Sequence, residues 1–232
     1  MRSRGAGTAQ QHSRCLTCLA GALLKAAFLA AILLLFGHAG ATAAASDTPL
    51  PSLPADAGHT QRVISYDDAS GKNIVVLTES DVSTRTAPGS PDVRLASKRL
   101  HAYGYLSTPH GFDRQWSVTD HVKDCPEYTS IGVRHQADRL TVTDLDGDGM
   151  AEVWMSYELW CKGDVSPNTL KVIMVENGRK HAIRGETLVE LPGTAPVGGL
   201  GVMDGHFRKA HPAMRSFARE YWKGASGGGM AR

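Results

Sequence analysis

Four carboxylates fall within nine residues of the stretch TDLDGDGMAEVWM, and no basic residue lies among them. They occupy positions 1, 3, 5 and 9 of a loop that starts at Asp144. Hard oxygen ligands at alternate positions can surround one Ca²⁺ ion, and Gly149 at position 6 permits the sharp turn that this arrangement needs. The backbone carbonyl of position 7 can add a ligand. We therefore predict a structural Ca²⁺ site that consists of Asp144, Asp146, Asp148, Met150 and Glu152.

The spacing differs from that of an EF-hand, because position 12 is Met155 where an EF-hand has a bidentate glutamate. The pattern D-x-D-x-D-G-x-x-[D/E] between two strands resembles the calcium loops of FG-GAP and other propeller-type repeats. Those loops occur in tandem, whereas this chain has one copy, so a propeller does not follow. Mg²⁺ fits the loop less well, since it keeps several waters. A solvated acidic turn without metal is the alternative.

Residues 1–45 have the order of a secretory signal peptide. Basic residues come first, an apolar run from Ala26 to Phe36 follows Lys25, and small residues end the segment. We predict cleavage after Ala43 or Ala45, export to the periplasm or the cell exterior, and no membrane span after cleavage. A retained membrane anchor is the alternative, although the strictly apolar run is short for a span.

Cleavage of this leader would change both the charge and the cysteine count. The chain has 25 Lys and Arg against 23 Asp and Glu, a net charge of +2, and four of the basic residues belong to the leader. The remainder has 25 − 4 = 21 basic residues and a net charge of 21 − 23 = −2, which gives no reason to expect nucleic acid as a partner. Cys125 and Cys161 remain, and in an oxidising compartment we predict a disulfide between them. Metal or catalytic use of the two cysteines is the alternative.

Strands and one helix are predicted to position these groups. Apolar alternation and turn residues indicate three hairpins, of residues 62–68 with 73–79, 98–107 with 115–122, and 169–176 with 180–185. The acidic loop joins residues 138–144 to a strand over 151–160, which carries large side chains on both faces and is therefore predicted to be central. Residues 80–97 contain two prolines and are predicted to be a long loop.

Apolar residues at three- and four-residue steps predict a helix from Pro212 to Lys223. The predicted fold is α+β, mainly an antiparallel β-sheet of hairpins with this helix packed on it. A flexible linker over 46–61, one globular domain over 62–223 and a flexible tail over 224–232 complete the prediction.

Two stretches, TVTDLDGDGMAEVWMSYELWC and DVSPNTLKVIMVENGRKHAIRGET, together with the aromatic C-terminal helix, carry a family resemblance that covers residues 140–222. In these stretches the chain resembles a family of small exported bacterial proteins that is associated by name with surface polysaccharide biosynthesis. DCPEY around Cys125 also fits. The resemblance implies a role in the cell envelope and carries over no catalytic residue.

Other side chains could take part in a site, although core packing or a solvated surface is the alternative for each. The histidines are His101, His121 and His135; the tryptophans that could stack on sugars are Trp116, Trp154 and Trp160. The basic residues that could hold an anionic glycan are Arg179, Lys180, His181 and Arg184 near a hairpin tip, and Arg208, Lys209, Arg215, Arg219 and Lys223 near the helix.

Common enzyme motifs such as G-x-S-x-G, H-E-x-x-H and the P-loop are missing from the sequence. We therefore expect a non-enzymatic envelope protein that supports surface polysaccharide assembly or binds a glycan, with a glycan or an envelope protein as its partner. The alternative is a Ca²⁺-dependent glycan-active enzyme. A deep cleft with paired carboxylates or a carboxylate–histidine pair would favour the enzyme, and a shallow aromatic or basic face would favour binding.

Overall fold

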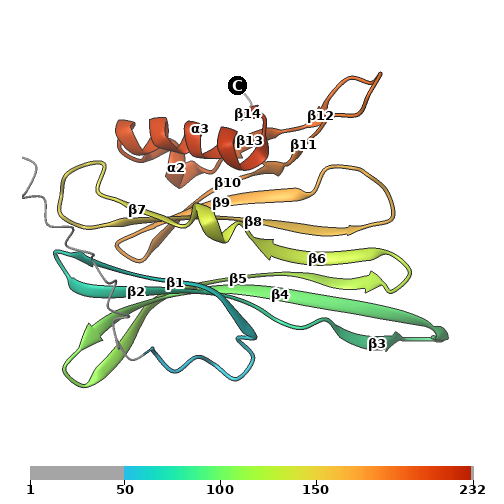
Figure 1. Cartoon of the computed structure of the whole chain (residues 1–232), viewed down its shortest axis with the longest axis horizontal. Helices are drawn as coiled ribbons and strands as arrows, with labels where there is room; N and C mark the ends of the chain where they lie inside the picture. Colours follow the sequence, from blue (N-terminus) through green and yellow to red (C-terminus); the bar gives the residue numbers. More distant parts are fainter. Residues whose placement is uncertain (1–49, 231–232) are drawn as a thin grey trace, which may run out of the picture. The chain divides into compact units, whose positions relative to one another are not determined.

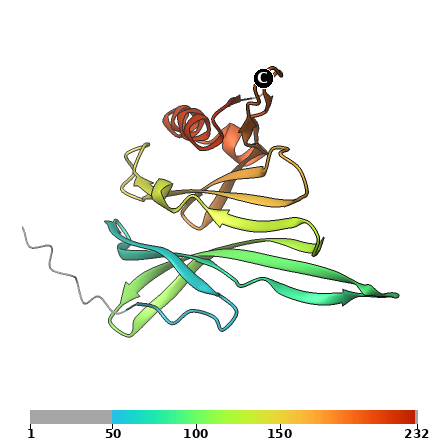
Figure 2. The ribbon, with the colours of Figure 1, turned by 45° about the vertical axis from the view of Figure 1, so that its right-hand side comes forward.

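Two β-sheets lie face to face in the computed structural model, and two helices cover the outer face of the second sheet (Figure 1). The model describes residues 50–230, so the predicted signal peptide and its cleavage site lie outside the described residues. Strands dominate this part of the chain and almost all pair antiparallel, which confirms the predicted α+β class. The view turned by 45° shows the same three layers (Figure 2).

The first sheet has the order β1-β2-β4-β3, and β5 also pairs with β4. Its strands are β1 (His59–Asp68), β2 (Gly71–Glu79), β3 (Ser83–Ala87), β4 (Ser90–Thr108) and β5 (Gly111–Pro126). The predicted β1–β2 and β4–β5 hairpins are confirmed. β1 begins at His59, three residues before the predicted start of the domain.

The prediction of a long loop over residues 80–97 is wrong, because β3 and the first part of β4 form a hairpin there. Pro88 and Gly89 make its turn, and Pro91 lies at the start of β4. Proline is tolerated at these positions, since turns and strand ends need no donor from its nitrogen. The side chains of β3 are almost all exposed, so this hairpin carries no apolar alternation that would reveal it.

The second sheet has the order β14-β13-β10-β9-β8-β6, and β7 also pairs with β8. Its strands are β6 (Ser130–His135), β7 (Thr141–Thr143), β8 (Glu152–Lys162), β9 (Thr169–Glu176), β10 (Arg179–Glu186), β13 (Leu200–Met203) and β14 (Gly229–Met230). The short strands β11 (Leu188–Val189) and β12 (Val197–Gly198) pair separately, and the 3-10 turn η1 (Ala137–Arg139) precedes β7. β8 pairs with β9 on one side and with β6 and β7 on the other, so the predicted central strand is confirmed.

Helices α2 (Gly205–Lys209) and α3 (Pro212–Ser226) form the third layer. The carboxylate of Asp204 caps α2 by accepting a hydrogen bond from Phe207 N at 2.8 Å. α3 begins at Pro212 as predicted and continues three residues beyond Lys223, and Gly229–Met230 then pair parallel with β13. Within residues 50–230, no helix is long and apolar enough to cross a membrane.

Alternation along β8 divides its side chains between two cores. Met155 and Tyr157 pack between the sheets with residues such as Leu100, while Trp154 faces α2 and α3 and contacts the cluster that includes Trp222. Met155, Trp154 and Trp222 are each at most 1% exposed. Burial of such large side chains contributes about 1.5–3 kcal/mol each. Because β8 contributes side chains to both cores, it stabilises the packing of all three layers.

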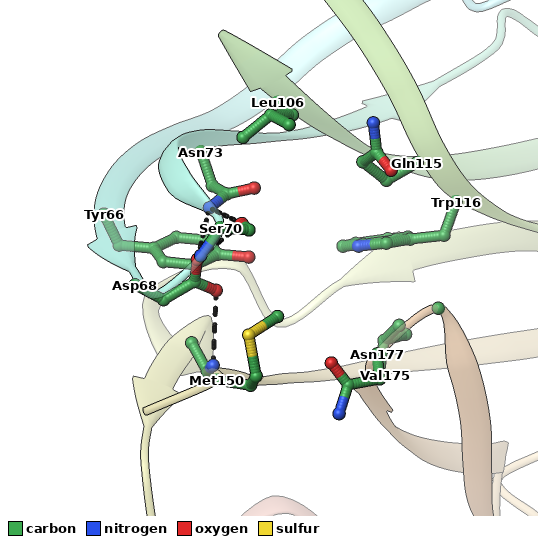
Figure 3. Close-up of a pocket in the computed structure, with 12 residues that line it drawn as sticks. Tyr66, Asp68, Ser70, Asn73, Leu106, Gln115, Trp116, Met150, Val175 and Asn177 are labelled. Atoms are coloured by element: carbon green, nitrogen blue, oxygen red, sulfur yellow. Dashed lines mark hydrogen bonds between the residues drawn. The ribbon is translucent and has the colours of Figure 1, made fainter. Parts of the chain in front are cut away.

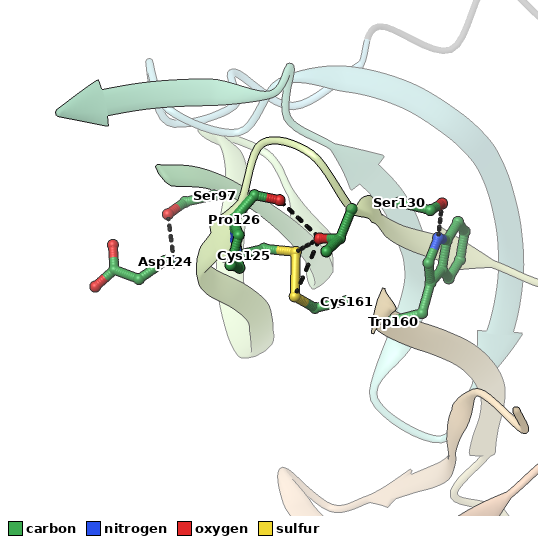
Figure 4. The surroundings of a disulfide bond; sticks show 8 residues. Ser97, Asp124, Cys125, Pro126, Ser130, Trp160 and Cys161 are labelled. Atoms are coloured by element: carbon green, nitrogen blue, oxygen red, sulfur yellow. Dashed lines mark hydrogen bonds between the residues drawn. A yellow bond between two sulfur atoms is a disulfide. The ribbon is translucent and has the colours of Figure 1, made fainter. Parts of the chain in front are cut away.

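A disulfide joins the two sheets directly, as predicted. Cys125 lies near the end of β5 in the first sheet and Cys161 near the end of β8 in the second, with their Cα atoms 5.7 Å apart (Figure 4). The Thr129 hydroxyl lies 2.9 Å from the Cys125 sulfur. The disulfide therefore adds a covalent link where no strand pairing connects the layers.

Candidate functional site

The acidic loop folds around its own carboxylates. Thr143 at the end of β7 pairs with Glu152 at the start of β8, which closes the loop. Gly147 and Gly149 have φ of 75° and 84°, which glycine adopts without strain. Asp144 accepts hydrogen bonds from the amides of these two glycines, at 2.9 and 3.1 Å.

Three of the predicted ligands converge, since carboxylate oxygens of Asp144, Asp146 and Glu152 lie within 4.8 Å of one another. Asp148 belongs to a second group, which it forms with Asp146 and the unpredicted Glu176 at the same spacing. The Met150 amide donates to Asp148 Oδ1 at 2.7 Å, which orders the backbone at position 7. The Met150 carbonyl as a ligand stays a prediction.

Glu152 is a fully buried carboxylate with 0% exposure. It accepts hydrogen bonds from the Thr143 hydroxyl at 2.5 Å and from Leu145 N at 3.0 Å, and the Thr143 oxygen in turn accepts from Trp154 Nε1 at 2.8 Å. In the described part of the chain, no Lys or Arg nitrogen lies within 4.0 Å of any of the four loop carboxylates. A buried charge without a counterion is unfavourable, and a divalent cation would supply the missing charge.

Glu176 is the ligand candidate that the sequence pattern does not contain. It ends β9, which pairs with β8 directly beside the loop. Burial raises the pKa of Glu176, and the negative charges of Asp146, Glu152 and Asp148 raise it further, against the opposing effect of Arg179. Glu176 lies 24 residues after Glu152 in the sequence, at the far end of the next strand. The antiparallel pairing of β8 with β9 brings it back beside the loop, so a local sequence pattern does not reveal it.

A pocket of about 320 Å³ lies beside the loop (Figure 3). Tyr66 and Trp116 face it from opposite sides, and the side chain of Met150 reaches into it. Its polar lining consists of Asp68, Ser70, Asn73, Gln115 and Asn177. The pocket is built where the β1–β2 turn, the acidic loop and the β9–β10 turn come together.

Asp68 connects this pocket to the acidic loop. It accepts hydrogen bonds from Ser70 N at 2.9 Å, from Asn73 Nδ2 at 3.0 Å and from Ala151 N at 3.3 Å, while Ala69 N donates to the Gly149 carbonyl at 2.8 Å. Burial alone would raise the pKa of Asp68, but these hydrogen bonds lower it, so the group is ionised at neutral pH.

The phenol of Tyr66 stays protonated at neutral pH. Burial, together with the charge of Asp68, raises the pKa of Tyr66 to about 12. Figure 3 shows its hydroxyl and the amide oxygen of Asn73 pointing across the pocket toward Trp116. The pocket therefore combines two aromatic rings with hydroxyl and amide groups that can donate and accept hydrogen bonds.

The indole ring of Trp116 occupies space that a glycine on the neighbouring strand leaves free. Gly104 is its cross-strand partner, and a Cβ at that position would come within 2.1 Å of the indole ring. The same arrangement recurs outside the pocket, where Gly132 pairs with Trp160 and an added Cβ would lie 2.0 Å from the ring. Glycine is required at both positions because the ring occupies the space of a side chain.

The other candidate residues are scattered. His101 and His135 are buried core residues, with His135 Nε2 3.0 Å from the His101 carbonyl oxygen, and His121 is exposed on β5. Trp154 lies in the helix-side core. Arg179, Lys180 and Arg184 are exposed, as are Arg208, Lys209, Arg219 and Lys223, whereas Arg215 is half-buried and His181 is buried.

Comparison of the chain with protein-family models, with curated protein sequences and with solved structures found no match in any of the three.

Proposed function

We propose that this protein is an exported, non-enzymatic carbohydrate-binding protein of the cell envelope, and that Ca²⁺ in its acidic loop stabilises the binding pocket. One observation carries the proposal. The pocket between Tyr66 and Trp116 shares Met150 and Ala151 with the acidic loop, so an ion bound in the loop would act on the pocket wall.

The chemistry of the pocket suits a sugar. Sugar rings present apolar C–H faces, which pack on aromatic rings, and hydroxyls, which need partners that both donate and accept. Trp116 offers the ring, while Asn73 and Asn177 offer amides. The pocket is near the lower end of the ~300–1,000 Å³ range of small-molecule sites, so it fits a single sugar unit of a longer glycan.

The charge of the pocket favours a neutral sugar over an anionic one. Among the residues that line it, Asp68 is the one with a formal charge, and the acidic loop lies alongside. A carboxylate or phosphate on the ligand would be repelled by these groups. The exposed basic residues Arg179 and Lys180 lie outside the lining.

The pocket favours binding over hydrolysis. A glycosidase typically uses two carboxylates on either side of the bond that it cleaves. Asp68 is the single carboxylate among the lining residues, and its oxygens already accept three hydrogen bonds from within the turn and one from Ala151 N. The proposed envelope location is supported by the disulfide, and it also draws on the predicted leader and the family resemblance.

A glycan array with matched variants tests the proposal. We expect the protein without its leader to bind a neutral glycan, Trp116→Ala to lose the binding, and EDTA to weaken it. Trp160→Ala is the control, since it removes a tryptophan with the same glycine packing outside the pocket. Equal binding by Trp116→Ala and the wild type would rule out this pocket, and binding that EDTA leaves unchanged would rule out the role of the ion.

A further inference from the structure

The inner face of the second sheet, which packs against the first sheet, is not covered across its whole width. The strand register places Tyr157, Lys171, Arg184 and Val202 side by side in one row across β8, β9, β10 and β13. Exposure rises along the row, from 2% at Tyr157 through 51% for the Arg184 side chain to 57% at Val202. The cover that the first sheet provides therefore ends near Lys171.

β5 is the strand of the first sheet that lies over this boundary. The carboxylate of Asp120 on β5 accepts a hydrogen bond from Tyr157 Oη at 2.9 Å and lies 2.5 Å from Lys171 Nζ. Among the described residues, β5 pairs with β4 alone, so the backbone along its other edge has no strand partner. The first sheet thus ends at a free edge, while the second sheet continues with β10 and β13.

The uncovered part of the second sheet forms a groove of about 590 Å³, which we call the open strip. Its lining includes Lys171, Arg184, Glu186, Leu200 and Val202. Leu200 and Val202 are each 57% exposed, although the apolar face of a sheet is normally buried against another layer. The open strip shares no lining residue with the pocket of Figure 3.

The free edge of β5 is regular in its central part. The pairing of β5 with β4 contains two bulges, and the regular run between them extends from Trp116 to Val122. Natural proteins usually protect a long exposed edge with lysines, prolines or bulges. This run contains no lysine, arginine or proline, and its one carboxylate, Asp120, points inward to Lys171. The backbone of the run is therefore able to pair with another strand.

We propose that an extended peptide segment of a partner protein adds to β5 as a sixth strand of the first sheet and covers the open strip. An added strand lies about 4.8 Å from its neighbour, and its side chains alternate between the two faces. The inward side chains pack on Leu200 and Val202, and an inward carboxylate pairs with Arg184. The Arg184 guanidinium can take this partner, since the carboxylate of Asp204 is 3.8 Å from it.

The edge and the strip together specify a peptide. A lipid or a sugar in the open strip would leave the backbone groups of β5 without partners, whereas an extended peptide pairs with them and also buries the two apolar side chains. The charge of Arg184 selects an acidic residue among the inward positions. This inference does not rest on the proposed sugar binding.

Defined peptides, titrated into the protein without its leader, test the proposal. The probes are capped heptapeptides with threonine at the four outward positions and two valines and one glutamate, in each order, at the three inward positions. A matched set has lysine in place of glutamate. We expect a glutamate peptide to bind at least about 10-fold more tightly than its lysine counterpart. Methylation of its backbone nitrogens should abolish binding, and amide hydrogen exchange over residues 116–122 should slow in the complex.

Variants of the strip locate the binding. Arg184→Glu should reverse the preference from glutamate to lysine peptides. Val202→Asp should weaken binding at least about 10-fold, because it places a charge under the added strand. Val82→Asp makes the same change at an exposed valine outside the strip and should bind as the wild type does. Near-UV circular dichroism checks that each variant is folded.

The proposal fails if no peptide binds at concentrations up to about 1 mM, if exchange over residues 116–122 stays unchanged, or if folded Arg184→Glu keeps the wild-type preference. Light scattering of the protein alone tests a second copy: a dimer that Val202→Asp converts to a monomer would assign the strip to that copy and overturn the proposal. Peptide binding without glycan binding would contradict the sugar proposal alone, and the reverse result would contradict this one alone.

Discussion

At the scale of single residues, Glu152 has two opposing roles. Its carboxylate orders the loop through Thr143 and Leu145, yet it is a fully buried charge without a basic partner. With an ion bound, the same charge becomes a ligand. The sign of its contribution to stability therefore depends on whether the ion is present.

Replacement of Glu152 by glutamine should separate these roles. In EDTA, Glu152→Gln should unfold within about 1 kcal/mol of the wild type, since the amide keeps an acceptor and removes a buried charge. At a Ca²⁺ concentration of about 100 times Kd, the wild type should gain about 2.7 kcal/mol and the variant almost nothing. Thermal unfolding measures both. Asp92→Asn, which also replaces a carboxylate by an amide but at an exposed position, should keep the full gain in stability. If Glu152→Gln gains as much stability from Ca²⁺ as the wild type, the predicted site is contradicted.

Buried histidines predict how the stability of the protein varies with pH. Burial is the largest cause that lowers the pKa of His101 and of His135 in the folded state. An unfolded histidine titrates near pH 6.5, so below that pH the unfolded chain binds more protons than the folded one. The stability that these neutral histidines contribute is complete above pH 6.5 and is lost as the pH falls toward the folded pKa values.

We expect the free energy of unfolding to fall by up to about 1.4 kcal/mol per pH unit for each such histidine below pH 6.5. His135→Gln should flatten this slope, because its side chain no longer titrates. Urea unfolding at a series of pH values measures the slope. An unchanged slope in His135→Gln would show that this histidine is not held neutral.

At the scale of elements, pairs of strands set the position of the aromatic rings. Gly104 on β4 and Trp116 on β5 form one cross-strand pair, and Gly132 on β6 and Trp160 on β8 form another. In each pair the ring lies over a glycine that has no room for a side chain. The two pairs are sterically alike, but the first alone borders the pocket.

Gly104→Ala should displace the Trp116 ring and abolish glycan binding, because the added methyl group would overlap the indole. Gly132→Ala should cause a similar loss of stability, of about 1–3 kcal/mol, while glycan binding persists. Glycan binding and thermal unfolding of both variants provide the test. Loss of binding in both would point to general disruption of the fold instead of displacement of one ring.

The hairpins, the central strand and the C-terminal helix could be predicted because each buries an apolar face with a clear period. The β3–β4 hairpin could not be predicted in this way. The side chains of β3 are almost all exposed, so they show no alternation of apolar and polar residues. The acidic loop could be recognised in the sequence because its four carboxylates lie within nine consecutive residues. Glu176 and the pocket residues Tyr66 and Trp116 come together through strand pairing, which no local pattern specifies.

At the scale of the whole described unit, the disulfide is a covalent cross-link between the two sheets, in addition to the backbone that runs from β5 to β6. Cys125 and Cys161 are 36 residues apart in sequence, so the bond closes a loop whose entropy loss corresponds to about 4 kcal/mol of stabilisation. The Cys125→Ala, Cys161→Ala double variant should lose about this amount in denaturant unfolding. Reduction of the wild type should give the same midpoint, and a reductant that leaves the wild-type midpoint unchanged would show that the sheets hold together without the bond.

The hydrogen bonds from Trp154 to Thr143 and from Thr143 to Glu152 connect the acidic loop to the core beneath α3. The indole at the end of this chain is fully buried and touches no solvent. We therefore expect its excited state to respond to the charge at the other end of the two hydrogen bonds. Ion binding in the loop should then change the ultraviolet emission of Trp154 without any added label.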